Sequence, residues 1–296
     1  LPPEQQSDVL AKALAAARDV WNAKARAGIL ADLAPHLPPH QKFQLMTEAL
    51  AAAREIWDES NRARALANLT SHLPSNLLPQ ALAAAREIRD ASARTYALIT
   101  MAPRLPSELL PQALAAAREI GDEYYRAQVL AALAFRLVEL AYPQEALATA
   151  RDIRDNGARA RTLATLALRF VELGYPQEAL AAARDIQDAG ARARALASLA
   201  SRLAEPRHLQ EILIVIMEIK DEYWSARARA LTALVPYLPK EMLARVLAIA
   251  RDTWHANACA GTLAALAPYL PEELLDRALA LAREIGDADA RAKALA

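Results

Sequence analysis

Ala-Leu-Ala-Ala-Ala-Arg-Glu-Ile occurs intact at 49–56, 81–88 and 113–120, and this octapeptide decides the fold. Degraded copies surround the intact ones, so that its arginine position returns every 32 to 36 residues. That position, here called the repeat arginine, is occupied by Arg18, Arg54, Arg86, Arg118, Arg151, Arg184, Met217, Arg251 and Arg283. A fixed period of this length indicates stacked structural repeats rather than one round core.

Each period predicts two helices. The octapeptide lies in the first helix, because alanine is the best helix former and lets helices approach closely. Proline-rich stretches such as Leu37-Pro38-Pro39 begin that helix, since proline is tolerated in the first turn. An aspartate such as Asp58 follows and is expected to cap the second helix. Prolines near the end of several second helices are expected to kink or end the last turn: Pro35, Pro103, Pro236 and Pro268.

The repeat pattern predicts an all-α protein, a right-handed α-solenoid of about nine two-helix repeats. Residues 1–296 are expected to form a single helical-repeat domain. Because the chain starts at a repeat boundary and stops inside the ninth repeat, we interpret it as an excerpt of a longer chain with a truncated last repeat.

Composition excludes several classes of function. Lysine plus arginine equals aspartate plus glutamate at 35 each, so net charge predicts no general attraction to nucleic acid or to an anionic membrane. The single cysteine, Cys259, excludes an internal disulfide framework and favours a reducing, cytoplasmic location. No apolar run approaches the ~20 residues of a membrane span, so no membrane partner is expected.

Two sets of charges recur in register and are interpreted as structural. An acid follows the repeat arginine in every repeat, as Glu87 follows Arg86. Most repeats also have an arginine eight residues after the repeat arginine, as at Arg94. We expect these charges to tie helix ends together within and between repeats, each exposed pair contributing only about 0–1 kcal/mol.

A third set of charges is the candidate binding surface. Positions ten and eighteen after the repeat arginine lie on one stripe of the second helix, away from its buried leucines. The tenth position gives Arg64, Tyr96, Gln128, Arg161, Arg194 and Arg229, the last corrected for a two-residue insertion. The eighteenth position includes Arg104, Arg136, Arg169 and Arg202. This basic stripe is either an ordinary solvated face or the surface that holds a partner, because solenoids bind along one continuous face.

The array resembles the tetratricopeptide (TPR) class, and repeats four to six resemble it best. Matching packing positions are Leu163, Leu166, Ala167, Phe170, Ala179, Ala183 and Ile186, with Gly174 in the turn. The family's Trp is Leu here, its Gly is Ala and its closing proline is absent, so a HEAT-like or other α-solenoid is the alternative. This Ala-Leu-rich array also looks like the C-terminal sensor regions of bacterial multidomain signalling ATPases. The TPR resemblance implies that the second helices line the inner face.

Sequence signatures of catalysis and of metal or cofactor binding are missing. No Gly-rich phosphate loop, HExxH or CxxC occurs. His36 and His40 are four residues apart, but Pro38 and Pro39 between them prevent a shared helical face. Cys259 and His255 have the spacing of a nucleophile and base without a visible third group. We therefore expect no enzyme activity, no cofactor and no metal.

Repeat seven departs from the pattern. Its first helix has Ile214 and Val215 where alanine is usual and Met217 in place of the repeat arginine, followed by Tyr223 and Trp224. These five residues either repack locally or form an apolar contact patch. Tryptophans share one position in three other repeats and are expected to pack at the helix junction: Trp21, Trp57 and Trp254.

The sequence thus favours a non-catalytic protein-interaction scaffold or sensor surface, with an acidic protein or peptide held on the basic stripe. Self-association through the apolar patch is a further option. A single-stranded nucleic acid is the alternative ligand, less favoured because stacking aromatics are few. A structural spacer or an engineered repeat protein without a ligand is the remaining alternative.

Overall fold

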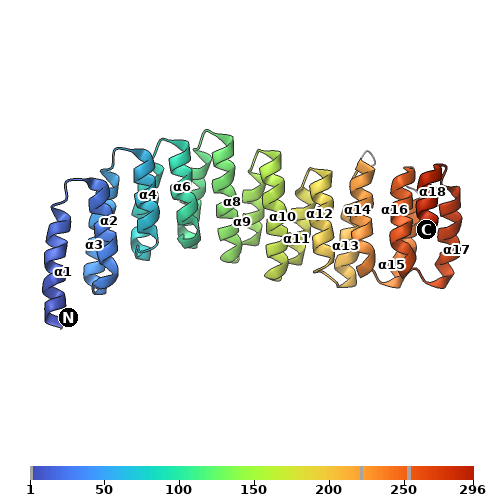
Figure 1. Cartoon of the computed structure of the whole chain (residues 1–296), viewed down its shortest axis with the longest axis horizontal. Coiled ribbons are helices and arrows are strands. Elements are labelled where there is room, and N and C mark those ends of the chain that lie inside the picture. Colours follow the sequence, from blue (N-terminus) through green and yellow to red (C-terminus); the bar gives the residue numbers. More distant parts are fainter. Residues whose placement is uncertain (1–2, 221–222, 252–254) are drawn as a thin grey trace. The chain divides into compact units, whose positions relative to one another are not determined.

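The computed structural model describes residues 3–220, 223–251 and 255–296. Within these ranges the chain is all-α: it forms helices α1 to α18 with short 3₁₀-helices between some of them, and no strand (Figure 1). The fold is the predicted α-solenoid of two-helix repeats. Two compact units can be distinguished, residues 1–155 and residues 156–296, and each is described by itself.

The first unit holds four complete repeats and the first helix of a fifth. Its first helices are α1 (Pro3–Arg18), α3 (Pro39–Arg54), α5 (Leu78–Arg86), α7 (Leu110–Arg118) and α9 (Pro143–Arg151). Its second helices are α2 (Ala23–Leu33), α4 (Glu59–Thr70), α6 (Ala91–Met101) and α8 (Glu123–Glu139).

The second unit begins with the second helix of repeat five. Its second helices are α10 (Asn156–Glu172), α12 (Ala189–Ala200), α14 (Trp224–Leu234), α16 (Ala256–Leu266) and α18 (Ala288–Leu295). The first helices between them are α11 (Pro176–Asp185), α13 (Pro206–Met217), α15 (Lys240–Arg251) and α17 (Glu272–Glu284).

Each unit has two layers, one of first helices and one of second helices. Consecutive second helices contact one another, α2 to α4 to α6 to α8 in one unit and α10 to α12 to α14 to α16 to α18 in the other. Where both helices of a repeat lie in one unit, the second helix also packs on its own first helix, as α2 does on α1 and α12 on α11. The core lies between the layers, where the leucines of the second helices and the alanines of the octapeptide are buried.

The local signals in the sequence act as expected. In α3, Ala49, Leu50, Ala52 and Ala53 are buried whereas Arg54 is exposed, so the octapeptide presents small residues to the core and its arginine to solvent. Side chains cap the second helices by accepting from the backbone N–H three residues on: Asn22, Asp58, Asp90, Asp122, Asp188 and Asp287. The residue before α16, His255, makes no such cap.

Late prolines end the second helices as predicted. Pro35, Pro103, Pro236 and Pro268 each lie in a 3₁₀-helix that directly follows the α-helix, η1 (Ala34–His36), η3 (Ala102–Arg104), η6 (Val235–Tyr237) and η7 (Ala267–Tyr269). Proline has no N–H for the α-helical ladder, so the last turn tightens instead of continuing. No helix in the described part of the chain is both long enough and apolar enough to cross a membrane.

Candidate functional site

The repeat arginines join one repeat to the next. Arg86 pairs with Glu119 of the following repeat through two hydrogen bonds. The same contact is made by Arg54 to Glu87, by Arg118 to Asp152 and by Arg184 to Glu218. Arg18 differs, since it pairs with Glu48 and not with Glu55. Glu55 pairs with Arg26 instead. The prediction that these charges hold the array together is confirmed.

The arginines eight residues further on bind within their own repeat. Arg94 Nε donates to the backbone carbonyl of Ile88 at 2.6 Å, and Arg62 donates to Ile56 at 2.8 Å. The same bond is formed by Arg126, Arg192 and Arg291. Since these carbonyls lie just after the first helix ends, the guanidinium fixes the turn between the two helices. These arginines are therefore structural as well.

A groove of about 790 Å³ runs between the exposed faces of α10 and α12. Alanines on both helices line it, among them Ala160, Ala164, Ala191 and Ala195. Polar groups stand around them: Arg161, Arg194, Asn156, Thr165, Asp188 and Ser198. The small side chains leave space between the helices that larger residues would fill.

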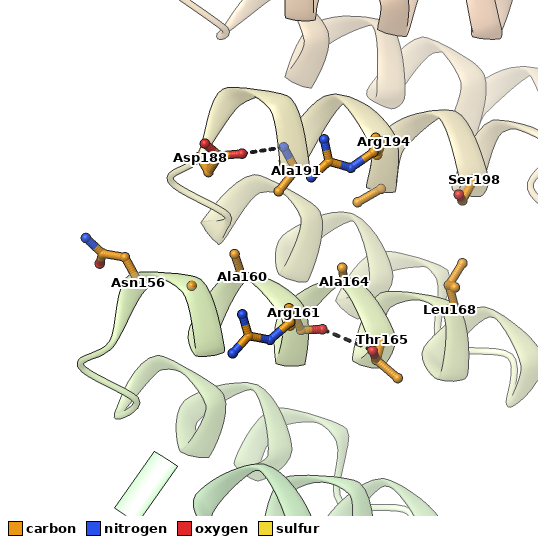
Figure 2. A pocket seen from close by; sticks show the side chains of 12 residues that line it. Asn156, Ala160, Arg161, Ala164, Thr165, Leu168, Asp188, Ala191, Arg194 and Ser198 are labelled. Atoms are coloured by element: carbon orange, nitrogen blue, oxygen red, sulfur yellow. Dashed lines mark hydrogen bonds between the residues drawn. The ribbon is translucent and has the colours of Figure 1, made fainter. Parts of the chain in front are cut away.

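Arg161 and Arg194 are the cations of this groove. Figure 2 shows them on neighbouring helices, each side chain running back toward the N-terminal end of its own helix. Both are exposed, and neither guanidinium has a hydrogen-bond or ion-pair partner among the described residues. The acid in the groove, Asp188, is engaged by the backbone N–H of Ala191 at 2.6 Å, as the N-cap of α12. The groove therefore holds two guanidiniums without described hydrogen-bonding partners and one carboxylate, a net charge of +1, above a surface of alanines.

The other residues at the tenth position line the same face of the second helices. Arg64 on α4 is exposed and lines a smaller groove of about 200 Å³ against α2. Tyr96 on α6 is half-exposed, and Gln128 on α8 is half-buried. Arg229 on α14 is exposed and donates from Nε to the carbonyl of Ser225 at 3.2 Å. The first unit thus carries less uncompensated charge on this face than the second.

The predicted stripe is divided, because the eighteenth-position residues do not line the groove. Arg104 donates to the carbonyls of Thr70, Ser71 and Leu73 in the preceding repeat, and Arg136 donates to Leu105 at 2.9 Å. Both side chains are half-buried and engaged by the preceding repeat, although Arg104 also lines a separate open groove of about 680 Å³ with Ser71 and Leu73. Arg169 pairs with Glu172 at 2.7 Å. Arg202 is exposed and, among the described residues, makes no side-chain bond.

Repeat seven only partly presents the predicted apolar patch. Val215 is fully buried, because α13 turns it toward the core, so its assignment to a contact surface is corrected. Ile214, Met217 and Tyr223 are exposed. Trp224 stacks on His255, with ring centroids 3.4 Å apart and an angle of 13° between the planes. Much of the extra bulk therefore repacks locally, and three apolar side chains remain at the surface.

The tryptophan position was predicted wrongly. Trp21 and Trp57 are 88% and 87% exposed and do not pack at the helix junction. The residue before Trp57, Ile56, is buried instead, and Val20 before Trp21 is half-buried, so the linker turns the next side chain to solvent. Trp254 lies outside the described residues.

His36, His40, Cys259 and His255 are the residues considered for metal binding or catalysis. No group of three His, Cys, Asp or Glu side chains gathers in the described part of the chain. His36 is exposed, and the side chain of His40 lies outside the described part. Burial raises the pKa of the Cys259 thiol, which disfavours the thiolate that a nucleophile requires.

Sequence reasoning missed the residues that shape the grooves. Lys24 lines the smaller groove, where its Nζ donates to Asn61 at 2.9 Å. Asp188 was recognised only as a cap, yet it also lines the larger groove. Gly190 was not singled out at all; it lies in the chain between Asp188 and Ala191, which do line that groove. A signal existed, because Lys24 and Gly190 both fall six residues after the repeat arginine, one helical turn before the tenth position.

Comparison with known proteins gives no family. No known family model matches the chain, and no curated protein matches it in sequence. Among solved structures, the crystal structure of Ton1535 from Thermococcus onnurineus NA1 is 18% identical with a TM-score of 0.33, covering 96% of this chain and 93% of that one.

A second solved structure is a circular tandem repeat protein with novel repeat topology and enhanced subunit contact surfaces. It is 18% identical with a TM-score of 0.18, covering 98% of this chain and 61% of that one. Both TM-scores are too low to carry an argument, so the repeat architecture rests on the helices described above.

Proposed function

We propose that this chain is a non-catalytic scaffold that holds an acidic protein segment on the exposed face of its second helices. The observation that carries the proposal is the pair Arg161 and Arg194, both without partners in the described structure and both lining the α10–α12 groove. Elsewhere in the array most arginines are engaged by acids or carbonyls. Two free guanidiniums over an alanine floor suit carboxylates, which accept charge-assisted hydrogen bonds from arginine.

Single-stranded nucleic acid is the weaker candidate. Proteins that bind it without sequence preference combine a positive groove with aromatic side chains on which bases stack. No aromatic side chain is among the described residues lining the α10–α12 groove. The nearest tenth-position aromatic along the chain is Tyr96, which belongs to the first unit. An acidic peptide needs no such platform, so the groove favours it.

We also propose that the repeats belong to the TPR-like class, as in the sensor regions of signalling ATPases. The burial of Leu163, Leu166, Ala167 and Phe170 supports this, because these are the large and small packing positions of the resemblance. Gly174 supports it too, since its φ of 81° makes the turn between helices that a glycine allows.

The test is charge reversal with a matched control. Arg161→Glu with Arg194→Glu reverses the groove, whereas Arg245→Glu with Arg277→Glu makes the same change in net charge on exposed residues of the first helices α15 and α17. The probe is a fluorescently labelled oligoglutamate peptide, followed by anisotropy at low salt. We expect the groove variant to lose at least about a hundredfold in affinity and the control to lose little.

Two results would contradict the proposal. Equal loss in both double variants would mean that overall charge and not the groove attracts the peptide. Tighter binding of labelled oligothymidylate than of oligoglutamate, with a steep fall in affinity as salt rises, would instead favour nucleic acid as the partner.

A further inference from the structure

Two guanidiniums border the space above Gly190, next to the α10–α12 groove. Gly190 lies in the first turn of α12, where it has no side chain. An atom at its Cβ position would lie 3.5 Å from Nη1 of Arg194 and 4.0 Å from Nη2 of Arg229. Guanidiniums from two neighbouring second helices, α12 and α14, therefore reach the same point. We call this point the Gly190 niche.

The Gly190 niche keeps a net positive charge. One acid borders it, Asp188, whose Oδ1 lies 3.4 Å from the same Cβ position. That oxygen already accepts from the N–H of Ala191. Arg194 has no described partner, and Arg229 uses only Nε, on the carbonyl of Ser225. Two like charges held together with one shared acid are stabilised when a further anion joins them.

Arg161 lies one helix away from the niche. Neighbouring packed helices are about 8–10 Å apart, so we expect about this separation between Arg161 and the niche. A polyproline II chain advances about 3.1 Å per residue and returns to the same face every third residue, which gives about 9 Å. In a β-strand, residues three apart point to opposite faces, so that conformation does not match.

We propose that the partner is an extended acidic segment in the polyproline II conformation whose acidic side chains are three residues apart. One carboxylate binds Arg161, and the other binds the Gly190 niche between Arg194 and Arg229. This inference rests on the proposed function and goes beyond it, because it specifies the spacing and conformation of the ligand. A helical ligand with acids seven residues apart spans about 10.5 Å and is the competing geometry.

The spacing is tested with labelled peptide rulers in which prolines separate two glutamates. One ruler has two prolines between the glutamates, and the others have one or three, so all carry equal charge. Anisotropy titrations at low salt are expected to give at least about tenfold tighter binding of the two-proline ruler than of the other two. A helix-forming peptide with glutamates seven residues apart is measured beside them. Its tighter binding would overturn the proposal.

The niche itself is tested by a carboxylate tethered inside it. Gly190→Glu places an acid next to Arg194 and Arg229, where it competes with the ligand, whereas Gly190→Gln has nearly the same shape without the charge. Both remove a glycine from a helix, so neither is expected to lower the urea midpoint. We expect the Gly190→Glu variant to bind the two-proline ruler only as tightly as the unmodified protein binds a peptide with one glutamate. The Gly190→Gln variant should keep most of the affinity for the ruler.

The possible failures are distinguishable. If all three rulers bind alike, or if the Glu and Gln variants lose affinity equally, the Gly190 niche is not a site while the proposed acidic-peptide function stands. If no ruler and no oligoglutamate binds the unmodified protein, the proposed function fails and this inference fails with it.

Discussion

The guanidinium of Arg104 donates to the backbone carbonyl of Leu73 in the preceding repeat, at 3.0 Å. It also donates to the carbonyls of Thr70 and Ser71, so a single side chain satisfies two acceptors at the end of α4 and one three residues beyond it. The last carbonyls of a helix have no partner within that helix. One repeat therefore completes the second helix of the repeat before it.

Loss of this contact is expected to destabilise the first unit. Arg104→Met keeps the aliphatic stem and leaves the three carbonyls without their donor, which we expect to cost about 1–3 kcal/mol in the free energy of unfolding. Arg202→Met is the matched control, because Arg202 occupies the same repeat position and is exposed without a described partner. Its effect should stay within about 0.5 kcal/mol. Urea titrations check both, and equal effects would contradict the capping role.

A pair of equivalent turns gives opposite predictions. Gly174 and Ala141 lie at the same repeat position, with φ of 81° and 65°. A residue with a Cβ is strained in this left-handed region. Gly174→Ala should cost about 1 kcal/mol, although nothing lies within 4 Å of the added carbon. Ala141→Gly should instead relieve the strain and raise the free energy of unfolding by about 0.5 kcal/mol. The gain is smaller than the strain itself because glycine adds entropy to the unfolded chain. Urea midpoints moving in the same direction would contradict this account.

Stability should depend on pH through Glu59. Hydrogen bonds from the backbone N–H of Asp90, and then from that of Arg89 at 3.1 Å, hold the pKa of Glu59 below its ordinary value. A lowered pKa in the folded state stabilises the fold above the ordinary value of 4.5, and this contribution is lost as the pH falls through the lowered value.

The measurement is urea unfolding of Glu59→Gln at neutral pH and at acid pH. We expect the variant to be less stable than the unmodified protein at neutral pH and the difference to shrink as the pH falls below about 4. Glu108→Gln is the control, since Glu108 is an exposed glutamate without a described partner. A difference at Glu59 that stays constant with pH would show that its charge is not what binds the next repeat.

Cys259 should react slowly in the folded protein. The residue is buried in α16, and burial raises the pKa of its thiol, so less thiolate is present at a given pH than for free cysteine. Labelling with iodoacetamide should be at least about tenfold slower than for free cysteine and should rise to the free rate in urea. A second chain, Cys259→Ala with Ser201→Cys, provides an exposed thiol as the control. Equal labelling rates for the two folded proteins in the absence of urea would contradict the burial of Cys259.

The fold was predictable because its signals are local and repeated. The octapeptide, the capping aspartates and the late prolines each act within one or two helical turns, and each sits where the sequence places it. The position of Trp57 was not predictable in this way. Its exposure depends on the direction of the linker after α3, and a shift by one residue exchanges the buried Ile56 for the exposed indole.

The candidate site was only half predictable. Helical spacing placed Arg161 and Arg194 on one face, and both line the groove. The same spacing grouped Arg104 with them, although its guanidinium binds carbonyls of the preceding repeat. That difference depends on where a neighbouring helix ends. The Gly190 niche likewise depends on Arg229 reaching across from another helix, which a periodic pattern within one helix does not reveal.

The pairing of the repeat arginines Arg54, Arg86, Arg118 and Arg184 with the acid of the following repeat has a consequence for how such a chain can grow. Arg54 and Glu87 are 33 residues apart, as are Arg86 and Glu119. Copying one whole period into the gene recreates both partners at the new junction, whereas an insertion of any other length within a helix separates them. The protein can therefore be lengthened or shortened by tandem duplication and deletion without the need for a new contact. The number of repeats can change in evolution while these ion pairs are kept.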